Sequence, residues 1–308
     1  MQLVQSSFKN PMQPWPSLLN FGKRIHLTSK NLDLFYFEAG PENPQHMIMV
    51  HGLGDEADTW RHVFLPLAKQ YHVFAVDLPG FGRSDKPICD YTPQFLMEVI
   101  YEFKKTLHID NPILMGSSLG GILAHVLAMD HPECVNGLVL VGGGLPQSKS
   151  MDDWGLRLMQ LPIIGEWLYT RLRKDPTAAF NSLRNVYHDL ESLPESDRKF
   201  LYTRVNQRVW DDHQRRAYFS TLRNLTPWIN RIQEKLPKQL KHLVVPTLVV
   251  RGEKDSLFST DNANQVIEIQ PTASKVIIDN TGHLPHQENP RAYLERVSNW
   301  LDKKPLTR

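Results

Sequence analysis

Short apolar runs alternate with amphipathic segments along most of the chain, and this alternation predicts the order of its secondary structure. Continuous apolar runs, such as residues 47–50, are typical of strands buried on both faces of a sheet. Apolar residues spaced three and four apart predict helices between them. The predicted strands are residues 24–28, 32–38, 47–50, 73–76, 113–115, 135–141, 246–250 and 275–278. The predicted helices are residues 59–70, 95–107, 122–129, 262–269 and 291–301.

The order of these elements predicts an α/β fold. The first two strands, separated by a turn at residues 29–31, form a predicted hairpin. Strands and helices then alternate, which is typical of a mostly parallel, doubly wound sheet with helices on both faces. We expect this core to comprise residues 22–144 and 229–308, preceded by an N-terminal arm at residues 1–21 that lies over the domain.

The middle of the chain breaks this rhythm. Residues 145–228 show no strand pattern and consist of amphipathic helical segments rich in aromatic side chains. These segments are expected to be separated by four prolines, namely Pro162, Pro176, Pro194 and Pro227. Because the strand pattern resumes afterwards, we interpret the region as a helical cap inserted into the core. An independent helical domain is the alternative.

The strand at residues 113–115 leads into Gly116-Ser117-Ser118-Leu119-Gly120, a Gly-x-Ser-x-Gly turn that opens the following helix. A sharp strand-to-helix turn of this kind lifts a serine clear of the sheet and presents its hydroxyl. The two glycines leave space where a side chain would collide with the backbone. The register puts Ser118 at the apex, so Ser118 is the predicted nucleophile. Ser117 is the alternative, and a turn serine without chemistry is the simplest other interpretation.

A base and an acid for this serine follow later in the chain. His283 comes after the strand at residues 275–278, and imidazole titrates close to neutral pH, as a general base requires. Asp255 directly follows the strand at residues 246–250 and is the predicted acid that orients the imidazole. His286 is the alternative base and Glu253 the alternative acid. Asp279 lies too close to His283 in the chain to face it comfortably.

Hydrolysis of a carbonyl compound also requires N–H donors for the developing oxyanion, each contributing about 3 to 4 kcal/mol. The backbone N–H of Leu119, at the start of a helix, is one predicted donor. The loop after the strand at residues 47–50 supplies the second, which makes the N–H of Leu53 the other predicted donor.

With the serine turn, Asp255 and His283 in this order, the chain resembles the capped, single-domain members of the α/β-hydrolase superfamily. The resemblance extends over about residues 24–301. The resemblance implies that Ser84, Asp85, Asp77 and His51 are structural rather than catalytic. The matching landmarks are His51-Gly52-Leu53-Gly54, Trp60, the run from Asp77 to Asp85, the serine turn, Gly252 with Asp255, Gly282-His283, Pro285-His286 and Glu288-Asn289-Pro290.

The residue at the apex narrows the chemistry that this resemblance implies. Relatives that dehalogenate or open epoxides carry an aspartate nucleophile at the elbow, whereas this chain has Ser118. A serine indicates an acyl-enzyme formed from an ester, thioester, lactone, amide or activated ketone.

Composition adds few constraints. The 308 residues carry a net charge of +2, which gives no reason to expect a nucleic-acid partner. Residues 1–20 have no apolar run typical of a signal peptide or membrane span, so we expect a cytoplasmic protein without stable membrane insertion. The two cysteines, Cys89 and Cys134, suggest no disulfide framework. No cofactor or metal is predicted, and the oligomeric state stays open.

The leading functional hypothesis is a serine hydrolase that cleaves a carboxylic ester of a small or medium apolar acyl group. The alternative is hydrolysis of a carbon–carbon bond in a dienoic diketone. Relatives with that activity typically show a Ser-Gly-Pro-Gly type of sequence after the His-Gly turn, where this chain has Leu53-Gly54-Asp55-Glu56. Lipase, lactonase and perhydrolase activities stay open, and a non-catalytic ligand receptor is a further alternative.

Overall fold

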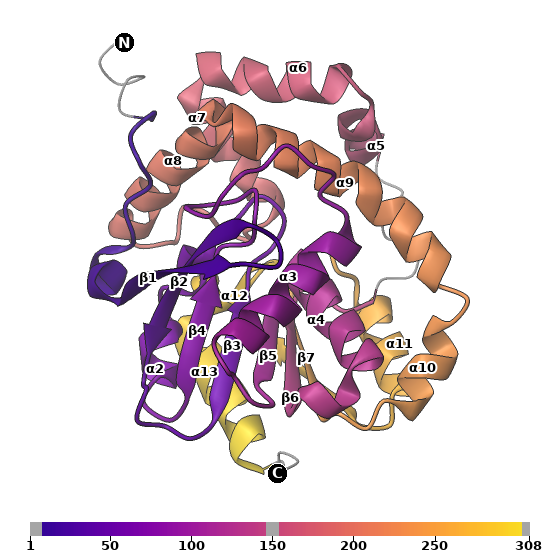
Figure 1. Cartoon of the computed structure of the whole chain (residues 1–308). Coiled ribbons are helices and arrows are strands. Elements are labelled where there is room, and N and C mark those ends of the chain that lie inside the picture. The colour runs from indigo at the N-terminus through magenta and orange to yellow at the C-terminus, as the bar shows by residue number, and fades with distance from the viewer. Residues whose placement is uncertain (1–7, 146–153, 304–308) are drawn as a thin grey trace.

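The computed structural model describes residues 8–145 and 154–303 and centres on a mixed sheet of eight strands (Figure 1). The order across the sheet is β1-β2-β4-β3-β5-β6-β7-β8. The pairs β1–β2 and β2–β4 are antiparallel, and every other neighbouring pair is parallel. The strands are β1 (Gly22–Leu27), β2 (Leu32–Ala39), β3 (His46–Val50), β4 (His72–Val76), β5 (Ile113–Ser117), β6 (Gly137–Val141), β7 (Thr247–Gly252) and β8 (Ala273–Ile278).

Both faces of the sheet are buried because alternate residues of each strand point to opposite sides. In β3, for example, Met47 and Met49 belong to one apolar cluster, whereas Ile48 and Val50 belong to the other. The first cluster also contains residues of η1 (Pro16–Phe21), η2 (Ala57–Trp60), α2 (Phe64–Leu67) and α13 (Pro290–Lys303). The second contains residues of α3 (Pro93–Thr106), α4 (Leu119–Asp130), α10 (Leu236–His242) and α11 (Thr260–Ile269). These layers confirm the predicted doubly wound α/β class.

Helices α5 to α9, which we call the helical layer, lie across the top of the molecule in Figure 1. They interrupt the core between β6 and β7 in the chain. The helical layer consists of α5 (Trp154–Gln160), α6 (Ile164–Arg171), α7 (Pro176–Asn181), α8 (Glu195–Trp210) and α9 (Asp212–Ile232). The predicted boundary after residue 228 falls inside α9, and part of the predicted region, residues 146–153, lies outside the described residues.

Two local predictions are wrong. The helix predicted over residues 59–70 is replaced by the short elements η2 and α2. A continuous helix there would place Pro66 in its interior, where proline lacks the N–H and collides with the preceding turn. Conversely, Pro227 does not separate helices but lies inside α9. The buried side chains of Leu225, Trp228 and Ile229 on that helix provide packing that offsets the lost hydrogen bond.

The segment before η1 runs along α8. Its carbonyl oxygens at Asn10 and Gln13 accept hydrogen bonds from the side chains of Gln207 (3.2 Å) and Arg204 (2.5 Å). The backbone N–H of Trp15 then donates to Asp58 of η2 at 2.6 Å. The N-terminal segment therefore contacts the helical layer and the core together.

No helix among the described residues has both the length and the apolar composition needed to cross a bilayer.

Candidate active site

Ser118 lies at a strained turn between β5 and α4. Its backbone has φ +51° and ψ −116°, and its N–H donates to the carbonyl of Val141 at 2.8 Å. A positive φ is uncommon for a residue with a side chain and marks a position that its surroundings must hold. A methyl group at Gly116 would lie 2.2 Å from the carbonyl oxygen of Gly120. The small residue is therefore required for the turn to close.

His283 and Asp255 lie side by side although they come from different loops. The Nδ1 atom of His283 is 3.1 Å from Oδ1 and 3.0 Å from Oδ2 of Asp255. Oδ1 also accepts the backbone N–H groups of Leu257 (2.9 Å) and Phe258 (3.0 Å), which fix the carboxylate. Both side chains are buried. A carboxylate at Nδ1 leaves Nε2 as the nitrogen that can exchange a proton with a hydroxyl.

The alternative residues take other positions. Glu253 is exposed and accepts the backbone N–H of Asn280 at 3.0 Å, whereas the carboxylate bonded to His283 is that of Asp255. The Nε2 atom of His286 lies 3.1 Å from the Thr59 hydroxyl, and its ring packs on Trp60 at 4.5 Å between centroids. Burial there lowers the pKa of His286 to about 3. Ser117 ends β5, and its buried hydroxyl has no hydrogen-bond partner among the described residues.

Ser118 and His283 line the same cavity, which has a volume of about 420 Å³. The helical layer and the carboxyl ends of the strands both contribute to its wall. Its apolar and aromatic lining consists of Leu53, Leu119, Ile122, Tyr169, Leu183, Val186, Tyr187, Leu201, Val205, Tyr218, Leu222, Leu225, Leu257, Phe258 and Leu284. A cavity of this size and lining suits a small or medium-sized apolar ligand.

The two predicted oxyanion donors border this cavity. Leu119 is the first residue of α4, so its N–H has no partner one helical turn earlier and is available to a ligand. Leu53 follows Gly52, where an added methyl group would lie 3.2 Å from the Cβ atom of Ser118. Both residues therefore lie beside the serine.

Two glycines after β6, for which the sequence predicted no role, make room for the serine and the histidine. A methyl group at Gly142 would lie 3.0 Å from the His283 ring, and one at Gly143 would lie 2.6 Å from the carbonyl oxygen of Ser118. The run Gly142-Gly143-Gly144 directly after a predicted strand was the signal that could have identified them.

A buried ion-pair group, also not predicted from the sequence, joins the helical layer to the loop after β3. Arg208 of α8 donates to both carboxylate oxygens of Glu56 at 2.8 Å and also contacts Asp55. Arg204, one helical turn earlier, lies 3.0 Å from Glu56. Although burial opposes ionisation, the Arg208 cation lowers the pKa of Asp55. Asp55 and Arg208 line the cavity and are bonded to each other, so these two charges compensate one another there.

The loop that carries His283 is attached to the helical layer. The backbone N–H of His283 donates to the carbonyl of Val186 at 2.8 Å. Glu288 accepts the backbone N–H groups of Gly282 and His188, each at 2.8 Å. The position of the imidazole therefore depends on contacts made by the segment between α7 and α8.

Residues expected to be structural are bonded within the core. The Nε2 atom of His51 accepts the backbone N–H of Leu78 at 2.9 Å. Asp77 accepts the Nε–H of Arg83 at 2.8 Å, and the Ser84 hydroxyl donates to the Asp77 carbonyl at 2.6 Å. These bonds shape the loops around the cavity.

A family model for the alpha/beta hydrolase fold matches residues 45–290, which include the serine turn, Asp255 and His283. The chain belongs to the α/β-hydrolase fold family. It is 29% identical to a 2-hydroxy-6-oxo-6-(2'-aminophenyl)hexa-2,4-dienoic acid hydrolase of Metapseudomonas resinovorans, over 87% of both chains. It is 25% identical to a pimeloyl-[acyl-carrier protein] methyl ester esterase of Photorhabdus laumondii, over 89% of this α/β hydrolase and 98% of the esterase.

Solved structures show the same fold. A meta-cleavage product hydrolase from Pseudomonas fluorescens superposes with a TM-score of 0.76 at 21% identity, covering 92% of this chain and 99% of that one. The relatives therefore include enzymes named for ester cleavage and enzymes named for dienoic acid hydrolysis. This α/β hydrolase is thus identified as a hydrolase.

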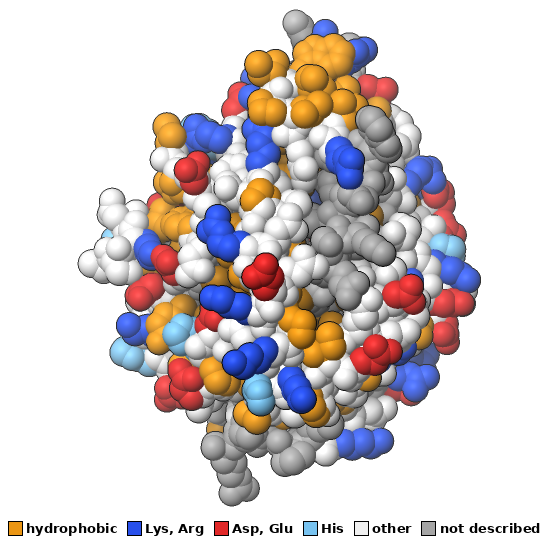
Figure 2. Space-filling view, turned by 90° about the vertical axis from the view of Figure 1, so that its right-hand side faces the viewer, with side chains coloured by type: hydrophobic (Ala, Val, Ile, Leu, Met, Phe, Trp, Pro, Cys, Tyr) orange, Lys and Arg blue, Asp and Glu red, His pale blue; other side chains and the backbone are white. Residues whose placement is uncertain are grey.

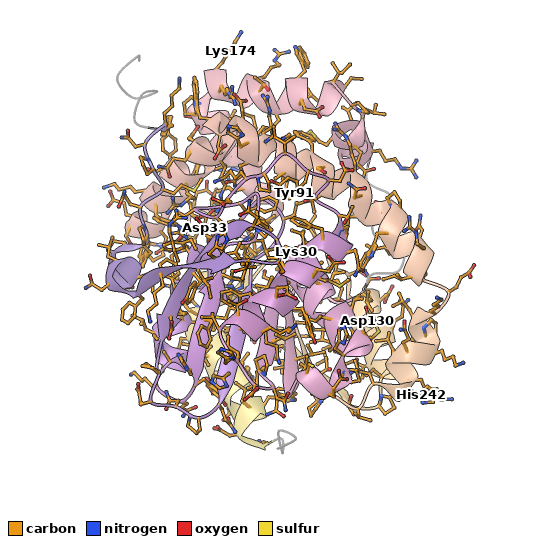
Figure 3. The ribbon with its side chains drawn as sticks, viewed as in Figure 1. Lys30, Asp33, Tyr91, Asp130, Lys174 and His242 are labelled. Atoms are coloured by element: carbon orange, nitrogen blue, oxygen red, sulfur yellow. The ribbon has the colours of Figure 1, made fainter. Side chains whose placement is uncertain are left out.

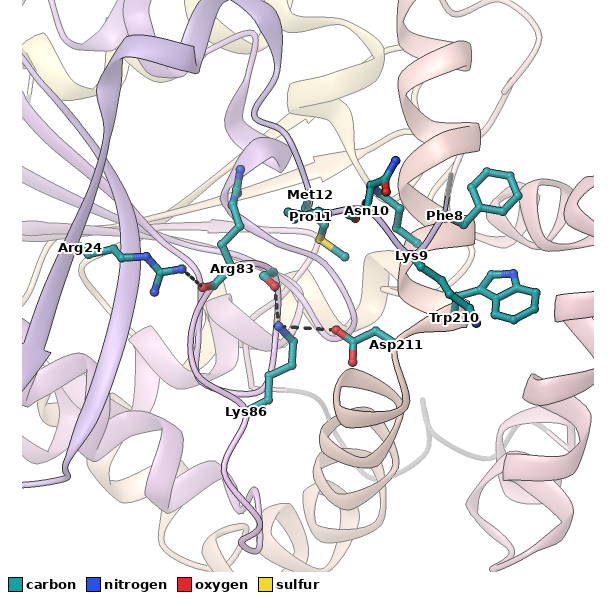
Figure 4. A pocket seen from close by; sticks show the side chains of 12 residues that line it. Phe8, Lys9, Asn10, Pro11, Met12, Arg24, Arg83, Lys86, Trp210 and Asp211 are labelled. Atoms are coloured by element: carbon teal, nitrogen blue, oxygen red, sulfur yellow. Dashed lines mark hydrogen bonds and ion pairs between the residues drawn. The ribbon is translucent and has the colours of Figure 1, made fainter. Parts of the chain in front are cut away.

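A second cleft of about 390 Å³ lies between the N-terminal segment, the loop after β4 and the junction of α8 and α9 (Figure 4). Its basic side chains already have partners. Lys86 donates to the Gly82 carbonyl at 2.6 Å and lies 3.6 Å from Asp211, and Arg24 donates to the Arg83 carbonyl at 2.9 Å. The cleft lacks the serine and histidine, so the cavity above Ser118 is the candidate active site.

Within the described ranges no group of three His, Cys, Asp or Glu side chains is arranged to hold a metal ion.

Proposed function

We propose that this α/β hydrolase cleaves a carboxylic ester of a small or medium apolar acyl group through an acyl-enzyme at Ser118. The observation that carries the proposal is that Ser118 and His283 line one predominantly apolar cavity, with Asp255 bonded to His283 behind it. Residues 145–228 act in this proposal as a cap that provides the acyl-binding wall.

The reaction begins when the Ser118 hydroxyl attacks the ester carbonyl and passes its proton to Nε2 of His283. Asp255 stabilises the imidazolium and holds its Nδ1–H. The N–H groups of Leu53 and Leu119 stabilise the oxyanion of the tetrahedral intermediate. When the intermediate collapses, the ester C–O bond breaks, and the alcohol leaves with the proton from His283. Water, deprotonated by His283, then attacks the acyl-enzyme carbonyl. The bond between the acyl carbon and the Ser118 oxygen breaks, that oxygen takes the proton back from His283, and the carboxylic acid is released.

The charges around the cavity favour an ester over a dienoic acid substrate. A dienoic acid brings a carboxylate, which a site recognises best with an unpaired arginine or lysine. Among the described residues that line the cavity, Arg208 is the one arginine or lysine. Its guanidinium is already bonded to Glu56 and Asp55. A substrate carboxylate would therefore compete with two protein carboxylates for that cation.

Carbon–carbon hydrolysis is retained as the second candidate, because the relative from Metapseudomonas resinovorans is named for it and the same serine chemistry applies. One substrate panel distinguishes ester hydrolysis from carbon–carbon hydrolysis. A panel of p-nitrophenyl esters of increasing chain length, run beside a dienoic diketone acid, should give the higher kcat/KM with an apolar ester. A higher kcat/KM with the diketone acid would overturn the ester proposal.

The nucleophile is tested independently with a fluorophosphonate probe. Labelling should disappear in Ser118→Ala and persist in Ser117→Ala, the matched control one residue earlier. Undiminished labelling of Ser118→Ala would contradict the nucleophile assignment. A correctly folded wild-type protein that binds ligands but hydrolyses nothing in the panel would support the receptor hypothesis.

A further inference from the structure

The outer surface of the helical layer carries a group of exposed apolar side chains at the turn between α5 and α6. Ile163 is 82% exposed and Trp167 is 56% exposed. The space-filling view shows hydrophobic side chains gathered at the top of the molecule, with basic side chains among them (Figure 2). We call this group the apical patch; it consists of Leu158, Leu161, Ile163, Ile164 and Trp167.

The tip of the apical patch is held in a strained conformation. Ile163 has φ +72° and ψ −48°, and the N–H of Ile164 donates to the carbonyl of Pro162 at 2.8 Å. This is a γ-turn of the rare positive-φ form, which is unfavourable for any residue with a side chain and most of all for a β-branched one. Burial within the chain does not compensate for it, because Ile163 is the most exposed residue of the patch.

The turn is fixed from beneath. A methyl group at Gly165 would lie 2.1 Å from the carbonyl oxygen of Met159 and 2.8 Å from the ring of Phe219. The start of α6 is therefore in close contact with α5 and α9, and these contacts direct Ile163 outward. A glycine would suit the positive φ better. An isoleucine at this position therefore indicates that its apolar side chain is used outside the folded chain.

The surroundings of the apical patch are basic. Residues 157–174 contain four cations (Arg157, Arg171, Arg173 and Lys174) against one acid (Glu166). Glu166 lies 2.6 Å from Arg223, and Arg173 lies 2.6 Å from Asp212, so both of these charges are compensated within the chain. The excess of positive charge therefore rests on Arg171 and Lys174. The Arg171 guanidinium lies 4.7 Å from the centroid of the Trp167 ring. Lys174 extends from the top of the molecule (Figure 3).

We propose that the apical patch binds an anionic lipid surface, with Ile163 and Trp167 entering the interface and the basic side chains remaining at the headgroups. A tryptophan and aliphatic tips bordered by arginine and lysine are the composition that interfacial helices present to membranes. Each cation near an anionic leaflet adds to the attraction. A second copy of the chain fits less well, because a two-fold contact would bring the two basic segments against each other.

The apical patch and the cavity share α6. Tyr169 of that helix lines the cavity and stacks on Tyr218 of α9, with 5.7 Å between ring centroids. Binding through the outer face of α6 therefore holds the cavity wall next to the lipid. An apolar ester dissolved in the membrane would then be the substrate source, a step that rests on the proposed function, whereas lipid binding itself does not.

The test is co-sedimentation of the full chain with vesicles of phosphatidylcholine alone or with about 30% phosphatidylglycerol. We expect binding to the anionic vesicles that weakens with salt. Replacing the two tips with acids (Ile163→Asp with Trp167→Asp) should reduce vesicle binding about tenfold or more. The matched control is Ile88→Asp, since Ile88 is 84% exposed but lies outside the apical patch. Equal loss in the control would overturn the proposal, as would equal binding of wild type to both vesicle types.

Ile163→Gly separates lipid binding from folding. Glycine relieves the positive φ, so the melting temperature should stay equal or rise while vesicle binding falls. If Ile163→Gly binds vesicles like the wild type, the proposal is wrong. A concentration-dependent dimer in sedimentation velocity that disappears in the tip variants would instead assign the apical patch to self-association. Ser118→Ala should bind vesicles unchanged, so failure of the lipid proposal is distinguishable from failure of the proposed reaction.

Discussion

The Nδ1 atom of His283 lies 3.0 Å from Oδ2 of Asp255, and the same carboxylate accepts two backbone N–H groups from the loop that follows it. Asp255 is therefore held as an acceptor before any substrate arrives. This arrangement orients the imidazole with Nε2 available for proton transfer.

Replacing Asp255 with asparagine should therefore abolish most of the ester hydrolysis. The amide can donate to Nδ1, which stabilises the wrong tautomer, and the expected loss in kcat is about 10⁴-fold. Steady-state kinetics with a p-nitrophenyl ester provides the measurement. Glu253→Gln is the matched control, because Glu253 bonds to Asn280 and not to the imidazole. Full turnover in Asp255→Asn with loss in Glu253→Gln would show that the acid is misassigned.

Gly143→Ala should reduce activity without unfolding the protein. The added methyl group would lie 2.6 Å from the carbonyl oxygen of Ser118, so the serine turn has to move. A displacement of about 1 Å costs on the order of 100-fold in rate. Comparison of kcat/KM with the melting temperature checks this. At Gly22 the nearest atom to an added methyl is the tip of the Phe35 ring, at 2.8 Å, so Gly22→Ala should retain activity.

Arg208→Met should destabilise the fold strongly. It would leave the carboxylates of Asp55 and Glu56 with less compensation in a buried position, and removal of one partner from a buried pair typically costs about 3 to 5 kcal/mol. Chemical denaturation measures the free energy of unfolding. The exposed pair Arg184–Glu191 is the control, since Arg184→Gln at a pair with both side chains 53% exposed should cost less than about 1 kcal/mol. Similar losses in both variants would contradict the importance of burial here.

Stability should fall as the pH is lowered from 6.5 to 5. Burial lowers the pKa of His286 to about 3 and that of His125 to about 4 in the folded protein, both from 6.5. In this window the unfolded chain binds protons that the folded protein does not, so protonation favours unfolding. Each histidine should reduce the free energy of unfolding by roughly 1.5 kcal/mol across the window. The free energy of unfolding should depend less steeply on pH in His125→Gln than in the wild type. An unchanged pH dependence would contradict a neutral, buried His125.

The sheet was predictable because its strands are apolar runs bounded by turns, a pattern that burial on both faces imposes locally. The serine turn was predictable for a similar reason, since Gly116, Ser118 and Gly120 are neighbours in the chain and their backbone geometry is local. Pro66 and Pro227 show the limit of local reasoning. At the first site the predicted helix is interrupted before the proline, which lies in the short helix α2, and at the second site tertiary packing accommodates the proline.

Relationships between distant segments could not be predicted from spacing. Arg208 of α8 is bonded to Asp55 and Glu56, residues about 150 positions earlier, and nothing in the local pattern pairs them. The roles of Gly142 and Gly143 depend on the close approach of His283 and Ser118. The exposure of Ile163 and Trp167 depends on which face of α6 packs against α9.

The sequence by itself determined the α/β class, the serine at the elbow and the order in which the acid and the histidine follow it. These features depend on residue type and short-range spacing. Only the tertiary structure placed Asp255 rather than Glu253 beside His283, enclosed the cavity and placed the apical patch outside it. Those outcomes depend on distances between segments far apart in the chain, which are set by packing of the whole sheet and the helical layer.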